Sequence, residues 1–416
     1  MSNPSVRLVR LPTLREHWRG GGFSRRIVMR MLSRVSTGSL TIVEGTSRQE
    51  FGPGGQPEAV VHIHSDEAYA SLLRSGIVGS GEAYMQGLWT TPDLVAVIRL
   101  FSANLQAMQA INTSASWSKK VLLKLMHLGN ANSKSGSARN ISAHYDLGND
   151  FFSLFLDPTM MYSSGVYPAA DSTLEEASVH KLDLLCKQLE LTADDHLLEI
   201  GTGWGGMAIH AATHYGCRVT TTTISREQHE YAQARVKELG LEDRVEVLCK
   251  DYRELEGTYD KLVSIEMVEA VGHQFYSEYF SRCSHLLKPG GLFAMQAITV
   301  QDQRYRQARD SVDFIKRYIF PGGALPSVEV IAKHLAKDTD LQIINLRDIT
   351  LDYARTLADW RERFTAAREE VTAQGFDQTF ERMWEFYLCY CEGGFRERII
   401  STVQVTMAKP GYRFGA

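Results

Sequence analysis

The chain has 416 residues, of which 44% are hydrophobic and 23% are charged, and its formal net charge is -4 at pH 7. This composition is typical of a soluble globular protein and excludes a fibrous or mainly disordered one, while the length predicts two domains. The net charge argues against a general nucleic-acid binder. No apolar run reaches the roughly 20 residues that span a bilayer, and the amino terminus lacks the apolar core of a signal peptide, so we expect a cytoplasmic protein.

Six cysteines lie scattered without the spacing of a zinc site or a disulfide framework, and we expect them to be reduced and mostly buried: Cys186, Cys217, Cys249, Cys283, Cys389 and Cys391.

The amino-terminal 36 residues are strongly basic, with eight arginines and one acid, Glu16. Their apolar residues recur at helical spacing, with four arginines off that face. The apolar set is Phe23, Ile27, Val28, Met31, Leu32 and Val35, and the basic set is Arg25, Arg26, Arg30 and Arg34. Two interpretations stay open: a helix docked on its own domain with a solvated basic face, or contact with anionic lipid head groups. A second basic amphipathic segment, "WSKKVLLKLMHL" at 117–128, supports the lipid interpretation.

A small mixed α+β domain is expected over residues 1–128. "SLTIVEG" and "AVVHIH" alternate like exposed strands, and "FGPGGQP" between them reads as a turn. Helical patterns follow in "DEAYASLLRSG" and "PDLVAVIRLFSANL". Residues 129–140, rich in Ser, Asn and Gly, predict a linker, which leaves 141–416 as the second domain.

The second domain is expected to be α/β. From about residue 174, five apolar strands alternate with helices: "HLLEIG", "CRVTTTTIS", "VEVLCKD", "DKLVSIEM" and "GLFAMQAIT". Strands of this kind predict a doubly wound parallel sheet with helices on both faces. "LQIINLRDIT" and "VQVTMAKPG" are candidates for further strands at the far edge.

A glycine-rich turn follows the first of these strands, in "LLEIGTGWGG". The acid precedes the glycines and none ends the second strand, so the pattern resembles the S-adenosylmethionine (SAM) loop of class I methyltransferases more than a dinucleotide loop. The loop residues are Glu199, Gly201, Gly203 and Gly205. A plain tight turn is the alternative.

Two further pairs are candidates for the same cofactor. Asp251 is placed to accept from an adenine amino group, with Tyr252 over the ring, although either could be an ordinary strand cap. Thr223 and Gln228 could bond the ribose, although an exposed helix start explains them almost as well.

Six ordered motifs resemble the cyclopropane fatty acid synthases, which include the mycolic acid cyclopropane synthases. They are "HYDLGNDFFSLFLDPTMMYSSGVY", "LLEIGTGWGG", "TISREQHEYA", "MVEAVG", "YIFPGGALPS" and "YCEGGFRERII", within residues 139–416, and "GSGEAYMQGLW" resembles the family's amino-terminal domain. The resemblance implies a class I SAM-dependent methyltransferase that alkylates a cis double bond in a phospholipid acyl chain, peripheral to the inner face of the membrane. It leaves open a homodimer and a partner reductase.

The resemblance also implies site residues. Tyr162 and Ser163 would touch the methionine part of SAM, with Gly201, Thr223 and Gln228 along the rest. The family holds bicarbonate with a Cys, a Glu, a His, an Ile backbone group and a Tyr, at the positions of Ser164, Glu269, Gln296, Ile298 and Tyr353. Two of the five differ here, because Ser164 replaces Cys and Gln296 replaces His. Both can still donate to bicarbonate, but without an imidazole the anion would be held more weakly or be absent.

The reaction requires a base, since alkylation of an alkene leaves a cation that must lose a proton in a pocket that excludes water. Glu269 is the only carboxylate of the five positions and is the candidate to favour the cation or orient the base. Glu266 is a rival, although strand alternation places it on the opposite side from Glu269 or nearer the strand interior.

Cyclopropanation is the leading function, and three alternative functions are considered. A mid-chain methylating enzyme of the tuberculostearic acid type, motivated by Ser164 and Gln296, would form an exomethylene group for a separate reductase. The same substitutions are compatible with a catalytically silent lipid- or SAM-binding protein. A nucleic-acid or small-molecule methyltransferase is disfavoured, because "IEMVEAVG" stands where an amino-methylase has an Asn/Asp-Pro-Pro-aromatic loop.

Helical parts such as "RMWEFYLCYCEGGF" are expected to form the wall of the acyl pocket. The alternative is that Trp384, Phe386 and Tyr387 belong to the ordinary hydrophobic core.

Overall fold

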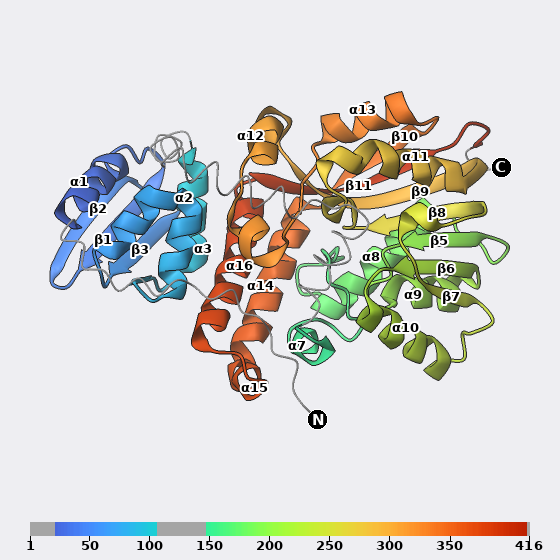
Figure 1. Ribbon diagram of the computed structural model, residues 1–416, viewed down its shortest axis with the longest axis horizontal. Coiled ribbons are helices and arrows are strands. Elements are labelled where there is room, and N and C mark those ends of the chain that lie inside the picture. Colours follow the sequence, from blue (N-terminus) through green and yellow to red (C-terminus); the bar gives the residue numbers. More distant parts are fainter. Residues whose placement is uncertain (1–20, 106–146, 414–416) are drawn as a thin grey trace.

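The computed structural model describes residues 21–105 and 147–413, which form two parts, each with its own sheet (Figure 1). The predicted basic segment at 117–128 and the predicted linker at 129–140 lie outside these ranges. The amino-terminal part has a four-stranded sheet in the order β2-β1-β3-β4. Its elements are α1 (Gly21–Leu32), β1 (Gly38–Glu44), β2 (Ser47–Gly54), β3 (Glu58–Ile63), α2 (Glu67–Met85), β4 (Trp89–Thr90) and α3 (Leu94–Ala103).

The predicted turn at 51–57 is wrong in part, because residues 51–54 belong to strand β2. β2 pairs antiparallel with β1, whereas β1 and β3 pair in parallel. β1 is therefore an inner strand and is mostly buried, not exposed as its alternation predicted. The glycines and proline of β2 are tolerated because they lie on an edge strand, where fewer ladder hydrogen bonds are lost.

The carboxyl-terminal part is the predicted α/β domain. Its seven-stranded sheet has the order β10-β11-β9-β8-β5-β6-β7, in which β9, β8, β5, β6 and β7 run parallel and β11 runs antiparallel to them. β10 pairs antiparallel with β11 and therefore has the direction of the parallel strands. The strands are β5 (His196–Ile200), β6 (Arg218–Thr223), β7 (Val245–Cys249), β8 (Tyr259–Ile265), β9 (Leu287–Val300), β10 (Gln342–Asp348) and β11 (Ile400–Ala408). The helices are α7 (Asn149–Ser153), α8 (Leu174–Gln188), α9 (Gly206–Tyr215), α10 (Arg226–Glu238), α11 (Tyr276–Leu286), α12 (Tyr305–Asp310), α13 (Val328–Asp338), α14 (Thr350–Ala366), α15 (Arg368–Ala373) and α16 (Gln378–Arg396).

The helices cover the sheet in two layers. One core cluster packs α8, α9 and α10 on the sheet, and another packs α11 and α13 on it. Helices α14 and α16 stand between the sheet and the amino-terminal part (Figure 1). The strand order reverses between β5 and β8, and in such sheets the ligand lies at the carboxyl ends of the strands beside that point.

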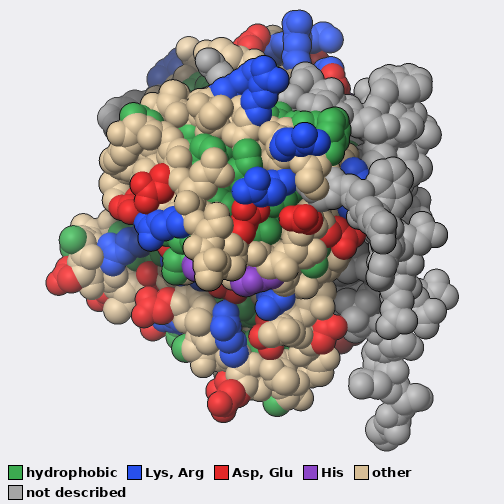
Figure 2. Space-filling model, turned by 90° about the vertical axis from the view of Figure 1, so that its left-hand side faces the viewer, with side chains coloured by type: hydrophobic (Ala, Val, Ile, Leu, Met, Phe, Trp, Pro, Cys, Tyr) green, Lys and Arg blue, Asp and Glu red, His purple; other side chains and the backbone are tan. Residues whose placement is uncertain are grey.

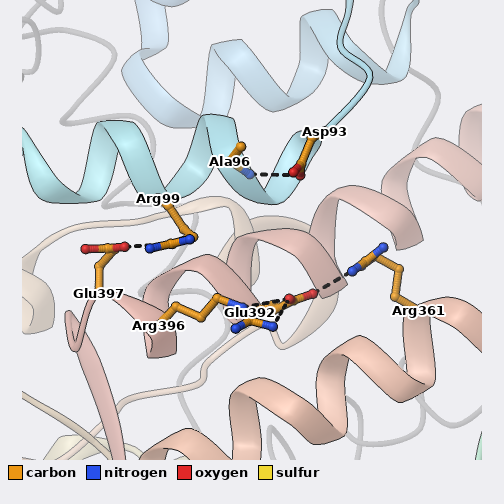
Figure 3. Close-up of polar contacts among 7 residues, drawn as sticks. All are labelled: Asp93, Ala96, Arg99, Arg361, Glu392, Arg396 and Glu397. Carbon is orange, nitrogen blue, oxygen red and sulfur yellow. Dashed lines mark hydrogen bonds and ion pairs between the residues drawn. The ribbon is translucent and has the colours of Figure 1, made fainter. Parts of the chain in front are cut away.

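The two parts meet along α16, which packs against α2 and α3. The contact is close, because a Cβ at Gly393 of α16 would lie 2.6 Å from Ile98 of α3. Ion pairs flank it (Figure 3): Arg99 donates to Glu397 at 2.7 Å, while Arg361 and Arg396 both bond the buried Glu392. Asp93 caps α3 by accepting from the Ala96 amide.

The basic amino-terminal helix α1 differs from its predicted faces at two positions. Phe23, assigned to the buried face, is 65% exposed. Arg25, assigned to the solvated face, instead forms an ion pair at 2.6 Å with Glu44 of β1, which also accepts from Tyr69. Arg26, Arg30 and Arg34 are exposed. Figure 2 views this end of the molecule, where Lys and Arg side chains lie among hydrophobic and acidic ones.

All six cysteines are free and four are buried, as predicted, whereas Cys249 is exposed and Cys391 is half-buried. Among the described residues no helix is long and apolar enough to cross a membrane. In the same ranges no group of His, Cys, Asp or Glu is arranged to hold a metal ion.

Candidate active site

A cavity of about 1000 Å³ opens at the carboxyl ends of the parallel strands. Its wall combines the glycine loop after β5, the segment 160–163, the turn after β8, and residues of α14 and α16. The amino-terminal part also contributes, through Gly76 of α2 and Phe101 of α3 among others. The cavity therefore extends from the predicted cofactor loop to the junction of the two parts.

The glycine loop has the geometry of a cofactor cradle. Gly201 and Gly203 have φ of 104° and 51°, a region that L side chains rarely adopt, and a Cβ at Gly203 would meet no atom within 4 Å. The backbone thus faces open cavity and leads into the first turn of α9, whose amide groups favour polar or anionic ligand groups. Residues of this kind fit the SAM that the sequence predicts.

The segment "MMYSSGVY" forms part of the wall, with Tyr162 and Ser163 lining the cavity. Gly206 allows its close approach, because a Cβ there would lie 2.7 Å from the Met161 sulfur. The Tyr162 hydroxyl lies 2.8 Å from that of Tyr387 on α16. Ser164 is fully buried, and its hydroxyl donates to the Gly165 carbonyl.

Most of the predicted cofactor residues line this cavity. Those that do are Tyr162, Ser163, Glu199, Gly201, Gly203, Thr223, Gln228, Asp251 and Tyr252. Gly205 does not, and instead caps α9 in a left-handed conformation. The Thr223 hydroxyl donates to Gln228, so the two form one polar unit.

Asp251 follows β7 and caps the one-turn helix Tyr252–Glu254, which is a local structural role in place of the strand cap that was the alternative to an adenine contact. It accepts from the Arg253 amide and binds its guanidinium at 2.8 and 2.6 Å. Arg253 in turn lies 5.3 Å from the Tyr252 ring centroid. A carboxylate has further acceptor capacity, so the adenine contact stays a prediction.

A buried lysine behind the wall was not predicted. Lys181 of α8 is fully buried and donates to the Ser163 hydroxyl at 2.7 Å. Burial lowers its pKa to about 8, while the carboxylates of Glu266, Asp157 and Glu199 oppose that shift. The signal in the sequence is the helical spacing of this lysine, which falls on the same face of α8 as the buried Ala177 and Leu185.

Glu199 lies behind the glycine loop on β5. It accepts from the Thr221 hydroxyl at 2.6 Å, and burial raises its pKa to about 8. Glu199 thus joins β5 to β6 through Thr221, and it also lines the cavity.

Glu266 lies at the centre of the predicted base site, so its predicted placement on the opposite side is wrong. Strand β8 ends at Ile265, and Glu266 has φ of 51°, so strand alternation no longer applies to it. Its carboxylate accepts from the Ser164 amide at 2.9 Å, the Gln296 side chain at 2.8 Å and the Tyr353 hydroxyl at 2.7 Å. Burial raises the pKa of Glu266, and these three donors oppose the rise.

Glu269 lines the same cavity, in the one-turn helix Val268–Ala270. One carboxyl oxygen accepts from the Ile298 amide, and the other is shielded from solvent and has no hydrogen-bond partner among the described residues. Desolvation and then the charge of Glu266 raise its pKa to about 8. Glu266 has three donors and a nearby Lys181 that favour its charged form, whereas Glu269 has one donor and faces the charge of Glu266, so a negative charge is better stabilised on Glu266 than on Glu269.

The geometry does not fit a bicarbonate ion at the predicted positions. Three of the predicted contacts, Ser164, Gln296 and Tyr353, donate to Glu266, and the Ile298 amide donates to Glu269. Gln296 Nε2 also donates to the Ser164 carbonyl. These donors already have acceptors, and a further anion would lie beside a carboxylate.

A family model described as mycolic acid cyclopropane synthetase matches residues 132–405 of this chain. The chain belongs to this family. Its members are SAM-dependent methyltransferases that act on lipid acyl chains, and this chain is a SAM-dependent methyltransferase.

Curated relatives match over nearly the whole chain. Tuberculostearic acid methyltransferase UfaA1 of Mycobacterium tuberculosis is 36% identical over 399 residues, which cover 93% of this chain and 92% of the relative. Cyclopropane-fatty-acyl-phospholipid synthase of Escherichia coli is 35% identical over 364 residues, covering 87% and 91%.

Solved structures agree with this assignment. The cyclopropane synthase MmaA2 from Mycobacterium tuberculosis has a TM-score of 0.61 and 32% identity, and covers 65% of this chain and 98% of its own. Mycolic acid cyclopropane synthase CmaA1, complexed with SAH and CTAB, has the same TM-score and coverage at 30% identity.

Proposed function

We propose that the protein transfers a one-carbon unit from SAM to the cis double bond of unsaturated phospholipid acyl chains and forms a cyclopropane ring, with Glu266 as the base. The observation that carries the proposal is the Glu266 carboxylate, held by three donors in the wall of the cavity. Ser164 and Gln296 stand where the family is expected to bind an anion. In this protein the Glu266 carboxylate accepts their hydrogen bonds instead.

SAM supplies an electrophilic methyl group on a sulfonium. Tyr162, Ser163, Thr223, Gln228 and the glycine loop would hold it, because they line the cavity beside the strand ends. The chain's contribution to methyl transfer is alignment, which supplies about 7–11 kcal/mol in favourable cases. The S–CH3 bond breaks, a C–C bond forms to one alkene carbon, and S-adenosylhomocysteine leaves while the neighbouring carbon becomes cationic.

Glu266 then takes one proton from the new methyl group, and the electron pair of that C–H bond closes the ring. Its three donors hold the carboxylate in one place, and Lys181 adds positive charge behind it. The raised pKa of Glu269 favours its neutral form, which would avoid a second negative charge next to the base. Apolar and aromatic side chains of the wall, such as Leu357 and Phe320, exclude water that would trap the cation as an alcohol.

A second product has a specific observation in its favour. The relative that covers 93% of this chain is a tuberculostearic acid methyltransferase. If a hydride shift precedes proton loss, the same base would leave an exomethylene branch, and a partner reductase would then be needed. Both products begin with the same methyl transfer.

We propose peripheral contact with anionic membranes on the side of α1. Arg26, Arg30 and Arg34 are exposed there beside the exposed Phe23, and the relative from Escherichia coli is by name a phospholipid enzyme. An exposed aromatic ring among basic residues is typical of interfacial helices.

Proton NMR with mass spectrometry of oleoyl phospholipid vesicles, incubated with purified protein and SAM, tests the function. Upfield cyclopropane signals and a mass gain of one CH2 are the expected result. Vinylidene signals would replace the cyclopropane proposal by the methylene one. Unchanged lipid, with SAM bound, would favour a silent binding protein.

A further inference from the structure

The wall of the cavity contains an arginine that has no anionic partner among the described residues. Arg304 ends the short helix Asp302–Arg304 that follows β9, and its side chain lines the cavity. Its Nε and Nη1 atoms are shielded from solvent and have no hydrogen-bond partner among the described residues. Burial lowers the pKa of Arg304, and only the weak opposing effect of Tyr390 counters it. An arginine side chain does not lose its proton in proteins, so the charge remains.

The other charges nearby do not neutralise it. Asp310 forms an ion pair with Arg309 at 3.0 Å, and Asp313 accepts from the Lys316 amide, with the Lys316 charge close by. Arg306 also lines the cavity, is exposed, and forms no ion pair with the described residues. The cavity wall therefore carries two guanidinium groups that form no ion pair within residues 21–105 and 147–413, and one of them has desolvated donors.

The position suits the end of a lipid. Glu266 and Arg304 line the same cavity, to which residues of the amino-terminal part, Phe101 and Leu105 among them, also contribute. Arg304 lies near Tyr390 of α16, the helix along which the two parts meet. An acyl chain with its double bond at Glu266 could therefore extend within this cavity toward Arg304. A phosphodiester follows the acyl ester in a glycerophospholipid, and arginine is well suited to bind phosphate oxygens.

We infer that Arg304, with Arg306 beside it, binds the phosphodiester of the lipid substrate at the junction of the two parts. The inference rests on the proposed function, and it makes a phospholipid, not a neutral ester of the same fatty acid, the preferred substrate. A guanidinium whose donors lack acceptors costs free energy in the unliganded protein, and an anion removes that cost on binding.

Binding of a non-reactive lipid tests this site separately from catalysis. Calorimetry would compare monomeric dihexanoylphosphatidylglycerol with dihexanoylglycerol, which lacks the phosphate. Arg304→Met should weaken phospholipid binding by about 10- to 100-fold and leave diacylglycerol binding unchanged. Arg309→Met is the matched control, because Arg309 already pairs with Asp310, and it should bind both lipids as the wild type does.

The melting temperature checks folding and gives a second readout. Without lipid, Arg304→Met should melt at or above the wild-type temperature, because it removes an unsatisfied buried charge. Unchanged phospholipid affinity in this variant would overturn the inference. So would equal wild-type affinity for the two lipids, or inorganic phosphate binding as tightly as the phospholipid, which would indicate a site for free phosphate.

Turnover separates the inference from the proposed function. Equal rates with oleoyl phospholipid and methyl oleate, both unaffected by Arg304→Met, would leave the function standing and remove the phosphate site. Binding of phospholipid that depends on Arg304, in a protein that alkylates no unsaturated lipid, would keep the site and remove the function.

Discussion

Lys181 is a buried charge of the site that lies near three acidic side chains. It bonds Ser163 and lies near Glu266, Asp157 and Glu199, so its charge stabilises the base and its hydrogen bond fixes the cofactor wall. Removing a single charge from such a cluster costs free energy, because the acidic groups stay buried without the compensating positive charge.

Lys181→Met should therefore lower the free energy of unfolding by about 3 kcal/mol, as judged by urea denaturation at pH 7. It should also weaken SAM binding, since Ser163 loses its donor. Lys187→Met, which removes only a surface pair with Asp183, should change stability by about 0.5 kcal/mol or less. Equal effects of the two variants would show that the buried charge stabilises nothing.

Glu269 makes stability depend on pH. Its pKa is raised in the folded protein to about 8 from 4.5. Its contribution to the free energy of unfolding is therefore fully present below about pH 4.5 and is lost as the pH rises through 8. Between pH 5 and 8 the Glu269→Gln variant should lose less stability than the wild type. The difference should be on the order of 1–2 kcal/mol after discounting for water in the cavity.

Denaturant titrations at several pH values measure this difference. The exposed Glu242→Gln serves as the control and should follow the wild-type curve. Parallel curves for the wild type and Glu269→Gln would contradict the raised pKa.

Much of the site could be predicted from sequence, because the motifs place Tyr162, Ser163, Glu269 and the glycine loop in one cavity. Glu266 could not be placed, since the prediction extended strand alternation one residue past the end of β8. Lys181 was missed because a single lysine in an amphipathic helix is usually solvated, and its burial depends on carboxylates far along the chain.

At the scale of elements, the contact of α16 with α3 joins the two parts of the cavity wall. Gly393→Ala would place a methyl group 2.6 Å from Ile98, which forces the helices apart. We expect a loss of about 1–3 kcal/mol in the free energy of unfolding, measured by urea denaturation, although alanine is the better helix former.

The neighbouring glycine is the matched control for this prediction. A Cβ at Gly394 would lie 3.3 Å from a side-chain carbon of Ile400, which can adjust, so Gly394→Ala should stay within about 1 kcal/mol of the wild type. If Gly393→Ala were equally mild, the close packing of α16 on α3 would be contradicted.

The parallel sheet was predictable because its strands are short, mostly apolar or β-branched segments that alternate with helices. The amino-terminal sheet was less so: β2, "SRQEFGPG", is polar and contains Gly and Pro, and only pairing with β1 makes it a strand. β1 and β3 are neighbours in the sheet and pair in parallel, although β2 lies between them in the sequence. Such a pairing leaves no local signal in the sequence.

For the whole molecule, α1 is the proposed surface for membranes. Replacing Arg26, Arg30 and Arg34 by Ala should reduce binding to vesicles containing phosphatidylglycerol, since each basic residue near an anionic surface contributes about 1 kcal/mol. Arg25 is kept, because its ion pair with Glu44 is part of the fold. Sedimentation of the protein with vesicles measures the effect.

The control removes the same charge elsewhere. Arg218, Arg226 and Lys237 are exposed on the carboxyl-terminal part, and their replacement by Ala should leave vesicle binding nearly unchanged. Equal losses in both triple variants would indicate attraction by overall charge and not by α1.

Glu266 is the base of the proposed lipid-alkylating reaction, and the proposed function depends on it. The most direct test is the rate of alkylation of oleoyl phospholipid vesicles in buffer freed of bicarbonate, for the wild type and Glu266→Gln. We predict an active wild type and a variant slower by about 100-fold or more, with SAM affinity retained. A wild type that is inactive until bicarbonate is added, or a Glu266→Gln variant with the full rate, would contradict the account.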